Sequence, residues 1–88
     1  MKVFITDKEK NIFLNKRLSL KAKGLYALLV SLLANNETIN FHNMKSFSGY
    51  GNEQLRSAIK ELVDSGFLSK ETIRDDGGRF YWTEYLLK

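Results

Sequence analysis

Residues 49–68 decide the fold of this chain and have the sequence GYGNEQLRSAIKELVDSGFL. The two glycines beside Tyr50 interrupt the chain, and the side-chain oxygen of Asn52 can accept hydrogen bonds from the first amides of a helix. The apolar residues that follow recur at helical spacing, at Leu55, Ala58, Ile59, Leu62 and Val63. Gly66 suits the left-handed conformation that ends many helices. We therefore predict a helix that begins near Asn52 and ends at Gly66.

The residues after this helix alternate between polar and apolar instead of following a helical period. The apolar residues of the two predicted strands are Phe67, Leu68 and Ile73 on the first, and Phe80, Trp82, Tyr85 and Leu86 on or near the second. Residues 75–78, DDGG, separate the strands and supply the positive φ that a tight hairpin requires. The sequence predicts a two-stranded hairpin, and alternation is expected to bury about half of its aromatic side chains.

A long helix is expected upstream, because Ser19 is a good N-cap residue and apolar residues follow it at helical spacing. This helix should end near Asn35. Gly24 lies inside it, where glycine costs up to about 1 kcal/mol relative to alanine. That cost suggests that another backbone packs close to Gly24.

A short helix is predicted from about Asn43 to Ser48, with Met44 and Phe47 on its buried side. The alternation of residues 38–41 suits a very short strand before it. Near the amino terminus, residues 3–5 suit another short strand. Residues 12–14 are apolar enough to pack against the predicted helices.

The order helix, turn, helix, hairpin predicts an α+β fold of the winged helix-turn-helix type, with three helices and a C-terminal β-hairpin. The chain has 88 residues, of which 43% are hydrophobic, and two separate cores would each be too small to be stable. The sequence contains no repeat, low-complexity tract or Gly/Ser linker. We expect one domain over residues 1–88.

The composition excludes several classes of protein. The chain has no cysteine and no proline, so it can form neither a disulfide nor a thiolate metal site. The longest mainly apolar run, residues 25–34, is shorter than the about 20 residues of a membrane-spanning helix. Charged residues 7–10 stand where a signal peptide would be apolar. We expect a cytoplasmic protein without membrane contact.

The net charge of +4 suggests an anionic partner, but the charge is unevenly distributed. Residues 1–25 hold seven basic and two acidic residues, a net charge of +5, whereas residues 26–88 have a net charge of −1. The densest basic cluster comprises Lys16, Arg17, Lys21 and Lys23, around the start of the long helix. Phosphate binding and a solvated, solubilising face explain this cluster equally well.

A helix followed by a hairpin can bind DNA, because an α-helix fits the major groove and the hairpin can reach phosphates or the minor groove. On this interpretation Asn52 and Gln54 can pair with adenine edges and Arg56 with guanine, although the sequence does not decide which of the polar residues contact bases and which contact phosphate. The side chains that suit phosphate are Ser57, Lys60, Arg74 and Arg79, with Lys21 and Lys23 as candidates from the long helix. Each residue alone would equally suit the solvated face of an amphipathic helix, so the pattern as a whole carries the prediction.

Residues for catalysis or metal binding are scarce. His42 is the only histidine, and it has neither a second histidine nor a cysteine to work with. Asp75 and Asp76 are adjacent in a predicted turn, where aspartate forms local hydrogen bonds. We expect no enzyme activity, no metal and no cofactor. The aromatic residues Phe80, Tyr81, Trp82 and Tyr85 could stack bases as a single-strand platform.

Two segments resemble a known family. Residues 17–29, RLSLKAKGLYALL, resemble the opening helix of the helix-turn-helix domains at the amino end of phage and plasmid replication proteins, including replisome organisers of Gram-positive bacteria and their phages. Residues 51–62, GNEQLRSAIKEL, and the DSGFL that follows after Val63 resemble the reading helix and first wing strand of the same group. The likeness covers about residues 12–83. It implies that Asn52, Gln54, Arg56 and Ser57 face DNA and that Arg79 lies in the wing.

We therefore expect sequence-specific binding of double-stranded DNA, in replication initiation or transcription regulation. Contact with the replication or transcription machinery and a weak homodimer are further expectations. The alternative is a winged-helix module for protein interaction or dimerisation that does not bind DNA. Its contact surface would be formed by Tyr50, Tyr81 and Tyr85.

Overall fold

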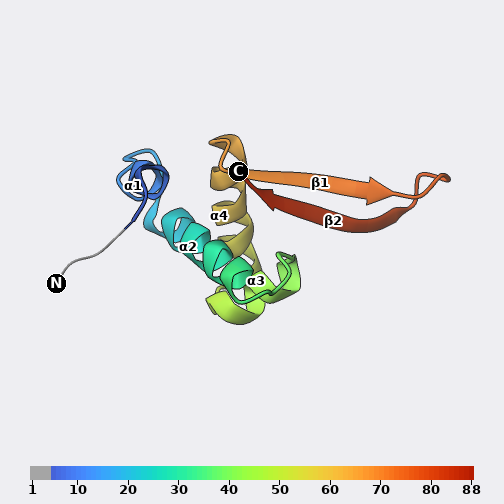
Figure 1. Ribbon diagram of the computed structural model, residues 1–88. Coiled ribbons are helices and arrows are strands. Elements are labelled where there is room, and N and C mark those ends of the chain that lie inside the picture. Colours follow the sequence, from blue (N-terminus) through green and yellow to red (C-terminus); the bar gives the residue numbers. More distant parts are fainter. Residues whose placement is uncertain (1–4) are drawn as a thin grey trace.

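Four helices and one β-hairpin follow one another in the computed structural model, which describes residues 5–88 (Figure 1). The elements are α1 (Asp7–Phe13), α2 (Leu20–Ala34), α3 (Phe41–Ser48), α4 (Asn52–Asp64), β1 (Leu68–Arg74) and β2 (Phe80–Leu87). The fold is α+β and compatible with a winged-helix arrangement. The sequence predicted three helices, and α1 is the fourth.

The core lies where α2 crosses α4, with α3 packed at one end of the pair (Figure 1). The fully buried large side chains of these elements and of β1 are Leu29, Met44, Leu55, Leu62 and Leu68. Every buried side chain in the described part of the chain is apolar or aromatic, and none is charged. Burial of these apolar surfaces therefore drives the docking of the helices.

The end of α4 sets the direction of the hairpin. Gly66 has a φ of 82°, as predicted for a left-handed residue after the helix. The Phe67 amide donates to the Leu62 carbonyl at 2.9 Å, and the Gly66 amide donates to the Val63 carbonyl at 3.1 Å. These are the two hydrogen bonds of a Schellman motif. The chain turns there, and buried Leu68 fixes the first residue of β1 to the body.

The hairpin is antiparallel, with Leu68 opposite Leu87 and Ile73 opposite Trp82. The DDGG turn forms as predicted, because the Asp75 amide donates to the Arg79 carbonyl at 2.9 Å and Gly78 has a φ of 81°. Arg74 then pairs with Phe80, so the register shifts by one residue and leaves Tyr81 without an opposite partner. Tyr81 is therefore the extra residue of a β-bulge.

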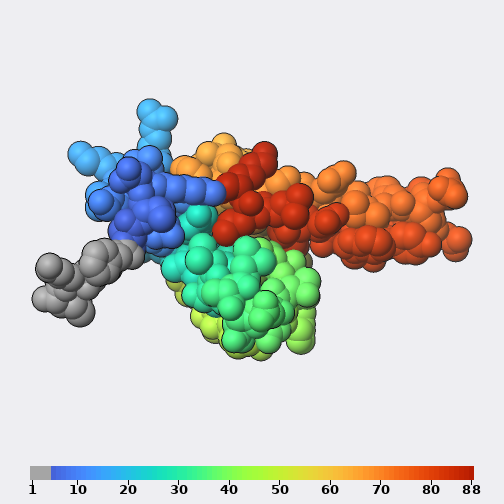
Figure 2. Space-filling model, in the orientation of Figure 1, coloured from blue at the N-terminus to red at the C-terminus, as the bar shows by residue number. Residues whose placement is uncertain are grey.

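The hairpin projects from the helices, and the molecule is 54 Å long in its longest dimension (Figure 2). Tyr85, near its base, is buried at 8% exposure. The rings of Phe80, Tyr81 and Trp82 are 59%, 60% and 53% exposed. The prediction that alternation buries about half of these aromatic residues is wrong, because the outer part of the hairpin extends past the body and has nothing to pack against.

The amino-terminal helix α1 begins with a capping box, in which the Glu9 amide donates to the Thr6 hydroxyl and the Thr6 amide donates to the Glu9 carboxylate. Ile12 is buried, as expected, but Leu14 is exposed. Of the strand predicted over residues 3–5, residues 3 and 4 lie outside the described part of the chain, and Ile5 is not in a strand.

Three local predictions around α3 and α4 are wrong. Residues 38–41 form no strand, because the Asn40 side chain caps α3 by accepting from the Asn43 amide at 2.7 Å. Phe47 is exposed, although Met44 is buried as predicted. The N-cap of α4 is Gly51, which has no side chain to form a cap hydrogen bond, and Asn52 is the first helical residue.

The prediction for Gly24 is also wrong. A Cβ atom added to Gly24 would have no neighbouring atom within 4 Å, so no other backbone packs closely there. Among residues 5–88, no helix combines the length and the apolar character that a membrane span requires.

Candidate nucleic-acid interface

Cations from α4 and β1 converge on one groove between the helix and the hairpin. The groove has a volume of about 310 Å³, and its charged lining residues are Arg56, Lys60 and Lys70. Arg56 and Lys60 are four residues apart and lie on neighbouring turns of α4. Lys70 is two residues after buried Leu68, so strand alternation places it on the face that meets α4. We call this feature the cationic groove; its lining, all within the described chain, includes no carboxylate.

Arg56 is held at the edge of this groove by an aromatic ring. Its guanidinium carbon lies 4.9 Å from the centroid of the Phe41 ring, a cation–π contact between α4 and the first residue of α3. The contact leaves Arg56 exposed to solvent. Arg56 therefore points along the side of α4 nearest the hairpin, with its position restricted by Phe41.

Lys60 is paired within its own helix. Its Nζ lies 2.7 Å from the Asp64 carboxylate, one turn further along α4, and both side chains are exposed. The hydrogen bond to Asp64 and the charge of Asp64 raise the pKa of Lys60. The positive charge of Lys60 persists, but Asp64 offsets it locally.

The structure brings Lys21 and Ser57 together, although they are 36 residues apart in the sequence. The Lys21 Nζ at the start of α2 donates to the Ser57 Oγ of α4 at 2.8 Å. Lys23 lies two residues further along α2, about 200° around the helix from Lys21. The two lysines therefore do not act on the same surface.

The face of α4 opposite the buried residues has mixed charge. Glu53 and three later residues recur every three or four positions, so they lie along one line of the helix and all are exposed. The later three are Ser57, Lys60 and Asp64. Two of these four are carboxylates, and Lys60 is paired with one of them. Asn52 and Gln54, in the first turn, are exposed and uncharged. Electrostatic attraction for an anion therefore comes mainly from Arg56 and Lys70 of the cationic groove, because Lys60 is paired with Asp64 on the outermost line of α4.

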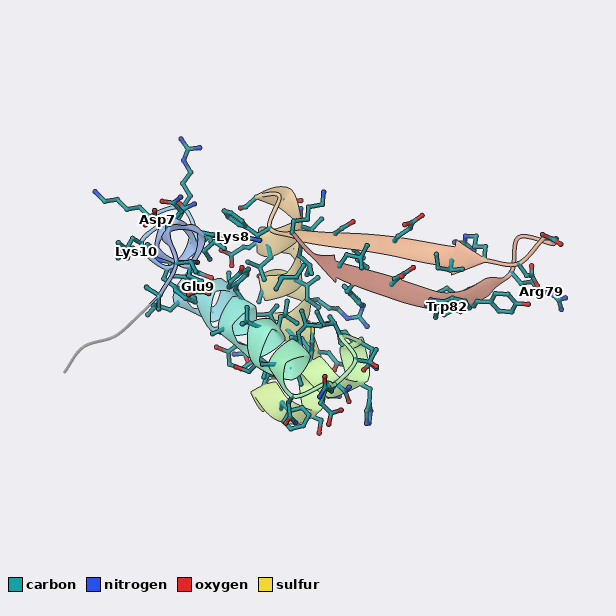
Figure 3. The ribbon with its side chains drawn as sticks, in the orientation of Figure 1. Asp7, Lys8, Glu9, Lys10, Arg79 and Trp82 are labelled. Carbon is teal, nitrogen blue, oxygen red and sulfur yellow. The ribbon has the colours of Figure 1, made fainter. Side chains whose placement is uncertain are left out.

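The two arginines of the hairpin are held by the turn. The Arg74 Nη1 donates to the Gly78 carbonyl at 3.2 Å, and the Arg79 Nε lies 3.1 Å from the Asp75 carboxylate. Figure 3 shows Arg79 at the far end of the hairpin, at the opposite end of the molecule from the charged residues of α1. Arg79 therefore lies far from the cationic groove, whereas Arg74 is four residues along β1 from Lys70, which lines it.

The two faces of the hairpin differ in charge. Lys70 and Arg74 alternate on the face that carries buried Leu68 and Tyr85. On the other face Glu71 lies directly opposite Glu84, a like-charge pair. One face of the hairpin is thus cationic and continues the cationic groove, and the other is acidic.

Two residues of the site were missed by sequence reasoning. Lys70 could have been found, because alternation from Leu68 places it beside α4. Phe41 could not, because its contact with Arg56 depends on how α3 and α4 cross. Residues 5–88 contain no group of three or more His, Cys, Asp or Glu side chains that could hold a metal.

No protein-family model, no curated protein and no solved structure matches this chain.

Proposed function

We propose that this chain binds double-stranded DNA as a winged helix, with the first turns of α4 in the major groove and the hairpin as the wing beside it. The observation that carries the proposal is the cationic groove, where Arg56, Lys60 and Lys70 converge from two elements with no carboxylate in the lining. A DNA backbone that passes between the helix and the hairpin would meet all three side chains. Phosphate contacts of this kind supply affinity and fix the orientation of the protein.

Sequence reading is assigned to the exposed polar residues in the first turns of α4. Asn52 and Gln54 have amide groups that can pair with the N6 and N7 atoms of adenine. Glu53, between them, can accept a hydrogen bond from the N4 amino group of cytosine. Such an interface makes few base contacts, and its affinity for DNA depends on the cationic groove.

The remaining basic residues would contact DNA phosphates at the edges of the interface. Arg74 and Arg79 would contact phosphates along the wing, and Lys21, held at Ser57 by a 2.8 Å hydrogen bond, would do so from the side of α2. The resemblance to phage and plasmid replication proteins suggests a cytoplasmic role in replication initiation or transcription regulation.

Selection of bound sequences from random duplex DNA tests this proposal. The expected result is an enriched site for the natural chain and a relaxed preference at one base position for Gln54→Ala, with a discrimination loss of about 1–3 kcal/mol. Lys8→Gln, on exposed α1, is the control and should enrich the same site. Absence of any enriched sequence at low salt would refute sequence-specific reading.

A second candidate function is protein interaction, favoured by exposed apolar residues of α2 and β2 that border one groove. Leu33, Trp82 and Leu86 are exposed and border a groove of about 610 Å³. Tyr85, which the sequence suggested for this contact, lines the same groove but is only 8% exposed and can contribute little area. A module of this kind would sediment as a dimer or bind a protein without binding duplex DNA.

A further inference from the structure

The outer half of β2 carries three aromatic rings that are not part of the hydrophobic core. Phe80, Tyr81 and Trp82 are 59%, 60% and 53% exposed, whereas Tyr85 on the same strand is buried in the core. Neighbouring large apolar side chains that are exposed together are a common mark of an interaction site. Their position beyond the core means that packing does not account for them.

Two of these rings are stacked on each other. The centroids of Tyr81 and Trp82 are 5.6 Å apart, and the ring planes differ by 21°. Successive side chains of a regular strand point to opposite faces, so this stacking depends on the bulge at Tyr81. The bulge therefore brings the two rings together on β2, and each ring keeps one face turned away from the other. Figure 3 places Trp82 along this strand, between the body and Arg79.

The aromatic surface adjoins cations. A third groove, of about 420 Å³, runs between the start of α3 and the hairpin and is lined by Phe41, Arg56, Lys70, Phe80, Tyr81 and Trp82 among others; Phe41, Arg56 and Lys70 also line the cationic groove. Its lining, drawn entirely from described residues, contains two cations and no carboxylate. We call it the aromatic groove. A volume of this size lies within the range of about 300–1,000 Å³ that is usual for small-ligand sites.

We propose that the aromatic groove binds unpaired bases of single-stranded DNA. Flat rings stack on bases of any sequence, and cations at one end of the groove attract the phosphates between them. Duplex DNA hides the faces of its bases in the helical stack, so the ligand must be single-stranded or locally opened. This inference goes beyond the proposed duplex binding, and it depends on β2 rather than on the first turn of α4.

Trp82 gives a direct readout, because it is the only tryptophan of the chain. A short oligothymidylate, which forms no duplex, should quench the fluorescence of Trp82 with a saturable dependence on concentration. Tyr81→Ala should weaken this binding by about 5-fold or more, the usual effect of removing one stacking ring, and Tyr81→Phe should retain it. Tyr81 is exposed, so neither variant should unfold the chain, which circular dichroism would verify.

The control Gln54→Ala separates this inference from the proposed function. It should change duplex preference and leave oligothymidylate affinity unchanged, because Gln54 is not among the residues of the aromatic groove. Binding of oligothymidylate without any selected duplex site would refute the duplex proposal alone. Three results would overturn the inference: no quenching at low salt, equal binding by Tyr81→Ala, or a Trp82 signal that changes only with protein concentration, which would show that a second copy covers the rings.

Discussion

The Glu61 carboxylate of α4 accepts two hydrogen bonds from Ser19, the residue that caps α2. The Ser19 amide donates at 2.9 Å and the Ser19 Oγ at 2.6 Å, and the two residues are 42 positions apart. The same Oγ accepts a hydrogen bond from the Ala22 amide at 3.2 Å. A carboxylate near a helix N-terminus is also favoured by the helix dipole. This contact therefore joins the start of α2 to α4 and adds to the apolar packing between the two helices.

Glu61→Ala should lower the free energy of unfolding by about 1–2 kcal/mol, because it removes charge-assisted hydrogen bonds that are partly shielded from water. Urea denaturation followed by circular dichroism measures this. Glu71→Ala is the matched control, since Glu71 is exposed and faces Glu84, and it should change stability little or raise it. Equal losses in the two variants would show that the Ser19 contact is not stabilising.

Stability should also depend on pH through Glu61. The hydrogen bonds from the Ser19 hydroxyl and amide, assisted by the charge of Lys21, lower the pKa of Glu61 in the folded chain. A carboxyl with a lowered folded-state pKa contributes stability above its unfolded pKa of about 4.3, and loses it as the pH falls through the folded value. The stability difference between the natural chain and Glu61→Gln should therefore be larger at neutral pH than at about pH 3. A difference that does not vary with pH would contradict this account.

Substitution by alanine should change the stability of the chain in opposite directions at two of its glycines. Gly66→Ala should destabilise the chain by about 1 kcal/mol or more, because its φ of 82° is unfavourable for a residue with a Cβ atom. Gly24→Ala should stabilise it by up to about 1 kcal/mol, since Gly24 lies within α2 and an added Cβ meets nothing within 4 Å. Thermal denaturation of the two variants would check both signs. A loss of stability in Gly24→Ala would mean that something packs there after all.

Elements specified by local chemistry could be predicted from the sequence. Ser19 caps α2, Gly66 ends α4, and the DDGG turn joins the strands, because each depends on the preferences of a few neighbouring residues. The helix α1 was missed because its apolar residues are few, and residues 38–41 were misjudged because the cap at Asn40 competes with extended pairing.

The candidate site was less predictable than the fold. Charge counting located the basic residues near the start of α2, whereas the structure gathers Arg56, Lys60 and Lys70 between α4 and the hairpin. The exposure of Phe80, Tyr81 and Trp82 depends on how far the hairpin extends past the helices, which alternation along a strand does not encode.

The ion pair between Lys60 and Asp64 predicts a gain of DNA affinity by removal of a charge. Asp64→Asn should release Lys60 for phosphate contact and strengthen binding to duplex DNA at low salt, with a steeper salt dependence. Asp7→Asn is the control, because Asp7 pairs with Lys10 on α1 and its loss changes the net charge equally. Fluorescence anisotropy with a labelled duplex would compare them. Equal gains would attribute the effect to net charge alone.

The most direct test of duplex binding at the cationic groove is the salt dependence of duplex affinity for three proteins: the natural chain, Lys70→Gln and Lys8→Gln. Both variants lose one positive charge, but Lys70 lines the cationic groove, whereas Lys8 lies on α1 and is not among the residues that line it (Figure 3). We expect the slope of log affinity against log salt concentration to fall by about 1 for Lys70→Gln and to stay unchanged for Lys8→Gln. The same slope in all three proteins, or no duplex binding at low salt, would contradict the assignment of the DNA interface to α4 and the hairpin.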